Sequence, residues 1–182
     1  MKPPVKAPVF NDILKHWART YIEKANDDGI VSGKEEGIFD PDGNVTREEF
    51  ITMLVNVLGL ELLETEQIFD DVEVGKWYEK YVNTAYKNGI ANGISENKFG
   101  ISKNITRQDM CVMAFNGFCK YLSEDESGER FSDDSDLAEY AKKAVYSLKN
   151  AGIINGRGNN AFEAHGTATR AEATVIICLF IS

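Results

Sequence analysis

Two kinds of apolar segment alternate along the chain, and both have helical spacing. In the first kind, apolar residues fall on one face, as with Trp17, Tyr21, Ile22 and Ala25. This spacing predicts an amphipathic helix that packs on one side only. The second kind is apolar on nearly all sides, as in residues 50–58, and such helices belong in the centre of a protein. The pattern therefore predicts outer helices arranged around central ones.

The whole pattern occurs three times. Each copy runs from a Phe-x-Asp start through a large aromatic residue, a Gly-Ile pair, a second glycine and a phenylalanine to a Thr-Arg motif. The threonines of this motif, Thr46, Thr106 and Thr169, are 60 and then 63 residues apart. A threonine with an acidic residue three positions later is typical of a capping box. Each Thr-Arg motif is therefore expected to begin a central helix.

The repeats predict how the chain is divided. We place a linker at residues 1–9 and three units at residues 10–62, 68–122 and 130–182. A single unit of this size could not bury both of its helices. We therefore predict an all-α fold, in which three helix-loop-helix repeats form one compact unit with pseudo-threefold symmetry around a central three-helix bundle.

The arginines of the three motifs need an explanation. Arg47, Arg107 and Arg170 are expected at the first helical residue, where the helix dipole disfavours a cation. Helix stability therefore does not explain them. We interpret them, together with free backbone N–H groups of the first turn, as sites that face an anion. On this interpretation, replacing Arg47 and Arg107 with alanine leaves thermal stability nearly unchanged.

The overall charge limits the partners of the chain. The net charge is −9 at pH 7 and the pI is about 4.8. Nucleic acid is not expected as a partner, because phosphate binding needs a basic face. Membrane insertion is not expected either, because the apolar run at residues 173–181 is too short to span a bilayer. Residues 1–8 lack the apolar core of a signal peptide, so the chain is a mature product or a piece of a longer protein.

The combined motif resembles the S-layer homology (SLH) family, over residues 10–182. The matching residues of the first unit are Phe10, Asp12, Trp17, Gly29-Ile30, Gly33, Phe39-Asp40-Pro41 and Thr46-Arg47-Glu48-Glu49. The third unit carries the family's Thr-Arg-Ala-Glu sequence itself, at residues 169–172. The resemblance implies three tandem SLH repeats.

The resemblance also implies a function. It identifies the chain as a non-catalytic, monomeric module, covalently part of a larger surface protein, located outside the cell on the bacterial cell wall or S-layer. The implied partner is a secondary cell-wall polysaccharide that is anionic because it bears a pyruvate ketal. No enzymatic activity, cofactor or metal site is implied.

The family's binding sites lie in grooves between neighbouring units. The arginines of the Thr-Arg motif would pair with the ketal carboxylate, the aspartates of Phe-x-Asp with sugar hydroxyls, and the aromatic residues would line the groove, while the glycine turns let the backbone approach the sugar. The implied glycan-binding residues are Arg47, Arg107, Arg170, Asp12, Asp71, Asp133, Trp17, Trp77, Tyr140, Gly29, Gly33, Gly89, Gly93, Gly152 and Gly156. Because Tyr140 replaces tryptophan in the third unit, we expect the groove that uses it to be the weakest.

Simpler interpretations stay open for several of these residues. The aspartates could be helix caps, the tryptophans could belong to the core, and the glycines could serve only to end helices. A calcium-dependent protein–protein interaction module of the dockerin or EF-hand type is the alternative function. Asp40, Asp42 and Glu49 fit ligand positions of a calcium loop, but Ile38 occupies the first position and cannot coordinate. No recurring pair of carboxylates suggests a glycosidase.

Overall fold

The computed structural model describes residues 9–64, 66–124 and 127–181, and within them the protein is helical. The α-helices are α1 (Arg19–Asp27), α2 (Arg47–Val57), α3 (Glu79–Lys87), α4 (Arg107–Phe118), α5 (Glu139–Asn150) and α6 (Arg170–Phe180). Three short 3₁₀ helices accompany them, at Cys119–Tyr121, Asp134–Asp136 and Gly158–Asn160. The described residues contain isolated β-bridges but no strand. The prediction of an all-α fold is confirmed.

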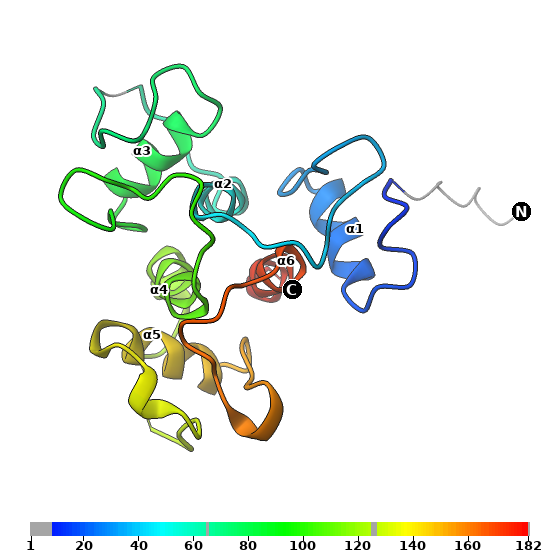
Figure 1. Cartoon of the computed structure of the whole chain (residues 1–182), viewed down its shortest axis with the longest axis vertical. Coiled ribbons are helices and arrows are strands. Elements are labelled where there is room, and N and C mark those ends of the chain that lie inside the picture. Colours follow the sequence, from blue (N-terminus) through cyan, green and yellow to red (C-terminus); the bar gives the residue numbers. More distant parts are fainter. Residues whose placement is uncertain (1–8, 65, 125–126, 182) are drawn as a thin grey trace, which may run out of the picture.

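The three helices that follow the Thr-Arg motifs form the centre of the molecule. Helices α2, α4 and α6 contact one another pairwise, and α1, α3 and α5 lie outside them (Figure 1). Side chains of the central helices are buried on nearly all sides, for example Phe50, Leu54, Met110, Ala114 and Ile177. Burial of this apolar surface is the main favourable contribution to folding. The predicted central bundle is confirmed.

Each outer helix packs on a central helix from a different unit. Helix α3 packs on α2, α5 packs on α4, and α1 packs on α6 (Figure 1). The outer helix of each unit thus covers the central helix of the preceding unit, and the first unit covers the last. The units are therefore interlocked into a closed ring, which the sequence analysis did not predict.

A ring of backbone hydrogen bonds closes around the pseudo-threefold axis. The N–H of Val45 donates to the carbonyl of Ala168 at 3.1 Å, Ala168 donates to Ile105 at 3.3 Å, and Ile105 donates to Val45 at 3.0 Å. All three residues are fully buried. Buried backbone groups must be paired, and here each unit pairs with both of the others.

The central helices begin as the sequence predicts. Thr46 and Thr169 accept hydrogen bonds from the backbone of Glu49 and Glu172, and those side chains bond back to the threonine N–H groups. Each pair is a complete capping box. Thr106 also caps α4, but the shorter side chain of Asp109 makes no return bond to the Thr106 N–H.

The outer helices begin without side-chain caps. Their N-cap residues are Ala18, Tyr78 and Ala138, and none of these makes a side-chain capping bond. The interpretation of the unit-start aspartates as helix caps is therefore wrong. Trp17 and Trp77 lie in the turns before α1 and α3, so they are not part of the helical stripe.

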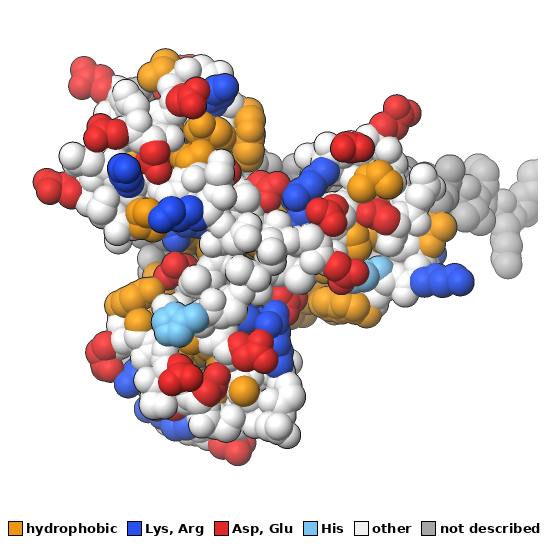
Figure 2. Space-filling model, viewed as in Figure 1, with side chains coloured by type: hydrophobic (Ala, Val, Ile, Leu, Met, Phe, Trp, Pro, Cys, Tyr) orange, Lys and Arg blue, Asp and Glu red, His pale blue; other side chains and the backbone are white. Residues whose placement is uncertain are grey.

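The surface has three lobes that carry side chains of both charge signs (Figure 2). Within the part of the chain that the structure describes, none of the helices is both long and apolar enough to cross a membrane.

Candidate functional site

Three grooves recur around the ring, and all three units contribute to each of them. Groove A, of about 440 Å³, is lined by the loop at residues 29–34, by Glu49 and Asn56 of α2, by Trp77 from the second unit and by Arg170 from the third. The loop and helix of this groove therefore come from the first unit, the aromatic residue at its edge from the second unit and the arginine at its base from the third.

Grooves B and C repeat this plan with different side chains. Groove B, of about 550 Å³, uses the loop at residues 90–94, α4, Tyr140 and Arg47. Groove C, of about 260 Å³, uses the loop at residues 153–157, α6, Trp17 and Arg107. In each groove the arginine comes from the preceding unit and the aromatic residue from the following one.

The arginines hold the loop of the neighbouring unit. Arg170 donates from Nε to the carbonyl of Phe39 at 2.9 Å, from Nη2 to the carbonyl of Ser32 at 2.9 Å and from Nη1 to Glu49 at 3.3 Å. Its guanidinium also lies 4.7 Å from the centre of the Phe39 ring. Arg47 makes the same contacts with Phe99, Asn92 and Asp109, and Arg107 makes them with Phe162, Asn155 and Glu172.

These arginines are deeply buried, with exposed fractions of 4–6%. Burial lowers the pKa of each one below its ordinary value, and the neighbouring carboxylate offsets part of that shift. An arginine remains protonated despite such a shift. Because the charge is paired and hydrogen-bonded, the structure contradicts the premise that the arginines have no structural role.

The backbone N–H groups of the three arginines, at the starts of the central helices, are also occupied. The N–H of Arg170 donates to the carbonyl of Gly43 at 2.9 Å, and the N–H of Ala171 donates to Pro41 at 2.9 Å. Arg47 and Arg107 likewise donate their N–H groups to carbonyls in the neighbouring loop. The prediction that free helix N–H groups face an anion is therefore wrong, because carbonyls of the next unit take that place.

The unit-start aspartates lie outside the residues that line the three grooves. Asp71 accepts hydrogen bonds from the N–H groups of Phe99, Gly100 and Ile101, at 2.7, 2.8 and 3.1 Å. Asp12 and Asp133 bind the corresponding loops in the same way. These aspartates hold the loop whose phenylalanine carbonyl the arginine binds, so they support the groove from behind.

The aromatic residues stand at the edges of the grooves and are open to solvent. Trp17, Trp77 and Tyr140 are 64%, 58% and 62% exposed. The alternative that the tryptophans belong to the core does not fit these values. A large aromatic ring exposed beside a groove offers a flat apolar surface to a ligand.

The glycines serve two structural purposes next to the grooves. Gly29, Gly89 and Gly152 end the outer helices with φ between +70° and +72°, a conformation that other residues rarely adopt. A Cβ atom at Gly33 would lie 2.6 Å from the Ile38 carbonyl oxygen, and one at Gly93 would lie 2.5 Å from backbone oxygens. A Cβ atom at Gly156 would meet the Ala161 carbonyl oxygen at 3.1 Å, a looser contact, and Gly156, like Gly29, Gly33 and Gly93, lines a groove.

The carboxylates of the possible calcium loop do not gather into a metal site among the described residues. Glu49 caps α2 and pairs with Arg170, and Asp40 pairs with Lys34 at 3.3 Å. Among the described residues, no group of three or more His, Cys, Asp and Glu side chains is placed to hold a metal ion. Nothing in this loop favours the calcium-dependent alternative.

Acid is expected to destabilise the protein through its loop-holding carboxylates. Burial disfavours the charged forms of Asp71 and Asp133, but backbone hydrogen bonds outweigh it and hold both pKa values below the ordinary 3.8. Because the folded-state pKa is depressed, this stabilisation is present above the unfolded-state pKa and is lost as pH falls through the folded-state value. We expect the melting temperature to fall below about pH 4, as thermal unfolding across pH can measure. A melting temperature that rises on acidification from pH 5 to 3 would contradict this assignment.

One difference among the grooves was missed in the sequence analysis. The residue directly after the second glycine of each unit lines its groove, and it is Lys34 in groove A, Ile94 in groove B and Arg157 in groove C. The signal was present in the sequence, because comparing the residue after Gly33, Gly93 and Gly156 in the three repeats shows this change of charge.

The fold and the grooves define a class of protein, namely an all-α ring of three repeats with one groove per repeat. The family model described as "S-layer homology domain" matches residues 9–51, 68–111 and 130–174. The chain belongs to the S-layer homology domain family, whose members are anchoring modules found at the cell surface or cell wall. The prediction of three tandem repeats of this family is confirmed.

Known relatives carry the same module within longer proteins. The chain is 36% identical over 171 residues to an amylopullulanase from Thermoanaerobacterium thermosulfurigenes, covering 92% of this chain and 9% of that protein. It is 35% identical over 175 residues to exoglucanase XynX from Acetivibrio thermocellus, covering 94% of this chain and 16% of that protein. It is 27% identical over 179 residues to the surface-layer 125 kDa protein from Lysinibacillus sphaericus, covering 96% and 15%. The chain thus spans less than a fifth of the length of these relatives.

Proposed function

We propose that this chain is a non-catalytic anchor that binds anionic cell-wall polysaccharide in its three grooves and tethers a larger surface protein to the bacterial cell wall. The observation that carries the proposal is the recurrence, in every groove, of a guanidinium at the base and an exposed aromatic ring at the edge. A charged group next to a flat apolar surface suits a sugar that bears a carboxylate.

The relatives support anchoring as the shared function. Two of them are named as enzymes that act on polysaccharides and one as a surface-layer protein, yet all three match this chain over more than nine-tenths of its length. The common part therefore serves proteins of different purpose. We propose that the parent protein of this chain carries its own cargo outside the matched region.

The chemistry of a groove suits a pyruvate ketal on the sugar. Of the five N–H donors of a guanidinium, Arg170 uses three in the bonds to Phe39, Ser32 and Glu49, which leaves two for a ligand. Hydrogen bonds from a guanidinium to a carboxylate are among the stronger ones in proteins. Trp77 also lines this groove, and its exposed ring would pack against the apolar side of the sugar.

Three grooves on one chain favour attachment to a polymer. Once one groove is occupied, the others meet neighbouring sugars at a high effective concentration, so modest affinities combine into firm attachment. Groove B is proposed to bind the glycan most weakly of the three. The hydroxyl of Tyr140 donates to Asp109 at 2.7 Å and accepts from Gln108 at 3.2 Å. These bonds hold the ring against α4, so it is less free than the tryptophans to pack on a sugar.

Calorimetric titration with purified wall polysaccharide, before and after mild acid removes its ketal groups, tests the proposal. We expect binding to the intact polymer and at least about tenfold weaker binding after ketal removal, as for the loss of one charge-assisted hydrogen bond. Equal binding to both polymers would show that neutral sugar is recognised. The absence of binding to both would refute the anchoring proposal.

Replacing Trp77 with alanine provides a second readout in the same titration. Because Trp77 is exposed, its removal should weaken polysaccharide binding while leaving the melting temperature nearly unchanged. Leu14→Ala, also at an exposed apolar residue but outside the groove linings, is the matched control and should leave binding unchanged.

A further inference from the structure

The three grooves differ most at one position, the residue after the second glycine. This residue is a lysine in groove A, an isoleucine in groove B and an arginine in groove C. The buried arginine at each groove base is the same in all three. The position after the second glycine is therefore where the grooves differ in charge.

The arginine at each groove base is already neutralised by its own carboxylate. Its Nη1 lies 3.3 Å from Glu49 in groove A, 3.4 Å from Asp109 in groove B and 3.0 Å from Glu172 in groove C. Each pair carries no net charge. Because that carboxylate already offsets the charge of the arginine, a second cation would strengthen the preference of a groove for a charged sugar over an uncharged one.

Groove A has a second cation that can reach a ligand. Lys34 lies 3.3 Å from Asp40, and the two side chains are 38% and 45% exposed. An exposed pair of this kind contributes little to stability, and the lysine ammonium sits on a flexible stem. Lys34 can therefore exchange Asp40 for a ligand carboxylate at little cost.

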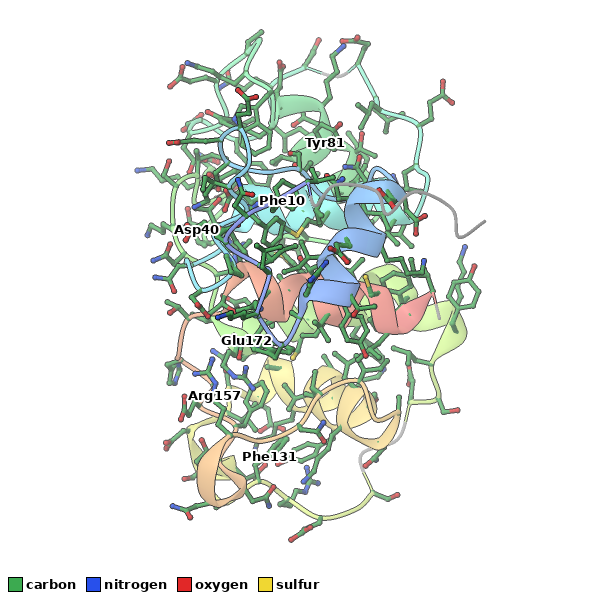
Figure 3. All side chains as sticks on the ribbon, turned by 90° about the vertical axis from the view of Figure 1, so that its right-hand side faces the viewer. Phe10, Asp40, Tyr81, Phe131, Arg157 and Glu172 are labelled. Atoms are coloured by element: carbon green, nitrogen blue, oxygen red, sulfur yellow. The ribbon has the colours of Figure 1, made fainter. Side chains whose placement is uncertain are left out.

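The second cation of groove C is held in place. Arg157 lies 2.6 Å from Glu163 and 2.8 Å from Glu172, to which it makes a second hydrogen bond at 3.0 Å. Figure 3 shows Arg157 next to Glu172 on the same side of the molecule. Burial disfavours its charge, yet hydrogen bonds to both carboxylates outweigh burial and raise the pKa of Arg157. Groove C is also the smallest of the three.

Groove B has no second cation among its lining residues. Ile94 is 45% exposed there, and Val112 stands where groove A has Thr52. Together with Tyr140, these side chains give groove B an apolar wall. Such a wall suits the uncharged face of a sugar and offers nothing further to a carboxylate.

We infer that Lys34 is the residue that selects the charged sugar, and that groove A reads the anionic substituent while groove B accepts an uncharged sugar residue. This inference rests on the proposed function, because it presumes that the grooves bind cell-wall glycan. It goes beyond it by assigning the preference for charge to one side chain and one groove.

Groove A can be observed by itself through its tryptophan. The chain has two tryptophans, and Trp77 lines groove A whereas Trp17 lines groove C. In a Trp17→Phe chain, the fluorescence of Trp77 reports on groove A alone. Oligosaccharides released from wall polysaccharide, with and without the ketal, are the probes.

In that chain, Lys34→Ile is expected to weaken binding of the ketal-bearing oligosaccharide by about 10- to 100-fold, as for loss of a hydrogen bond between charged groups. Binding of the ketal-free oligosaccharide should change by less than about twofold. Ile94→Lys, followed by calorimetry, should add a second ketal-selective site. Lys24→Gln, which removes an equal charge from an exposed pair on α1, should change neither affinity.

Two outcomes separate this inference from the proposed function. If the Trp17→Phe chain prefers the ketal and Lys34→Ile keeps that preference at Trp77, the assignment of Lys34 is overturned while anchoring stands. If the unmodified chain binds neither oligosaccharide nor polysaccharide, the proposed function itself fails, and this inference fails with it.

Discussion

Replacing Arg170 with alanine is expected to lower the free energy of unfolding by about 3–5 kcal/mol, the usual cost of removing one partner of a buried, hydrogen-bonded ion pair. The change would leave the carbonyls of Phe39 and Ser32 without their donor and would leave Glu49 half-buried without its cation. Urea denaturation of the two chains measures the difference directly.

Two further substitutions sharpen this test. Arg19→Ala removes an exposed pair with Glu23 on α1 and should change the free energy of unfolding by less than about 0.5 kcal/mol. Arg170→Lys keeps a positive charge but not the planar fork of donors, so it should recover only part of the loss. A loss below about 1 kcal/mol for Arg170→Ala would return the arginine to a purely ligand-binding role.

A chain that ends at Leu122 is expected to lose cooperative folding altogether. It lacks α5 and α6, so α1 loses the central helix on which it packs, and α2 and α4 lose the third side of the bundle. It also lacks Arg170, which holds the loop of the first unit. Because whole domains are stable by only about 5–15 kcal/mol, the loss of one third of the core should exceed that margin.

Near-ultraviolet circular dichroism and chemical denaturation check this expectation. We expect weak tertiary signals and no sharp transition for the truncated chain. Adding a second chain that covers residues 127–182 should restore both, since the contacts between units are not covalent. A truncated monomer that unfolds in one sharp transition would show that two units can fold without the ring.

Local features of the fold could be predicted from sequence because they depend on nearby residues. The Thr-x-x-acid motifs at Thr46 and Thr169 correctly predicted where α2 and α6 begin, since both partners of a capping box lie within one turn. The apolar character of residues 50–58 predicted the position of α2 in the centre, since only burial suits a helix of that kind.

Contacts between units could not be predicted in the same way. The bonds of Arg170 to the first unit join residues more than a hundred positions apart, and two of its acceptors are backbone carbonyls. Every residue has a carbonyl, so no side-chain pattern marks these acceptors. Trp17 was misplaced for a different reason, because α1 begins at Arg19 and the spacing before it is not helical. Each outer helix packs on the central helix of the preceding unit, and this arrangement depends on the packing of the whole ring rather than on any local pattern.

The packing of α1 on α6 has a mechanical consequence for a surface anchor. Tension applied to the chain ahead of residue 9 would not unfold the first repeat by itself. The packing of α1 on α6 would have to break before either helix could separate from the ring. The hydrogen bonds of Arg170 to Phe39 and Ser32 lie across that same junction and would share the load. A pulling force on the anchored protein would therefore be resisted by contacts of the whole ring, and the three grooves would keep their geometry until those contacts break.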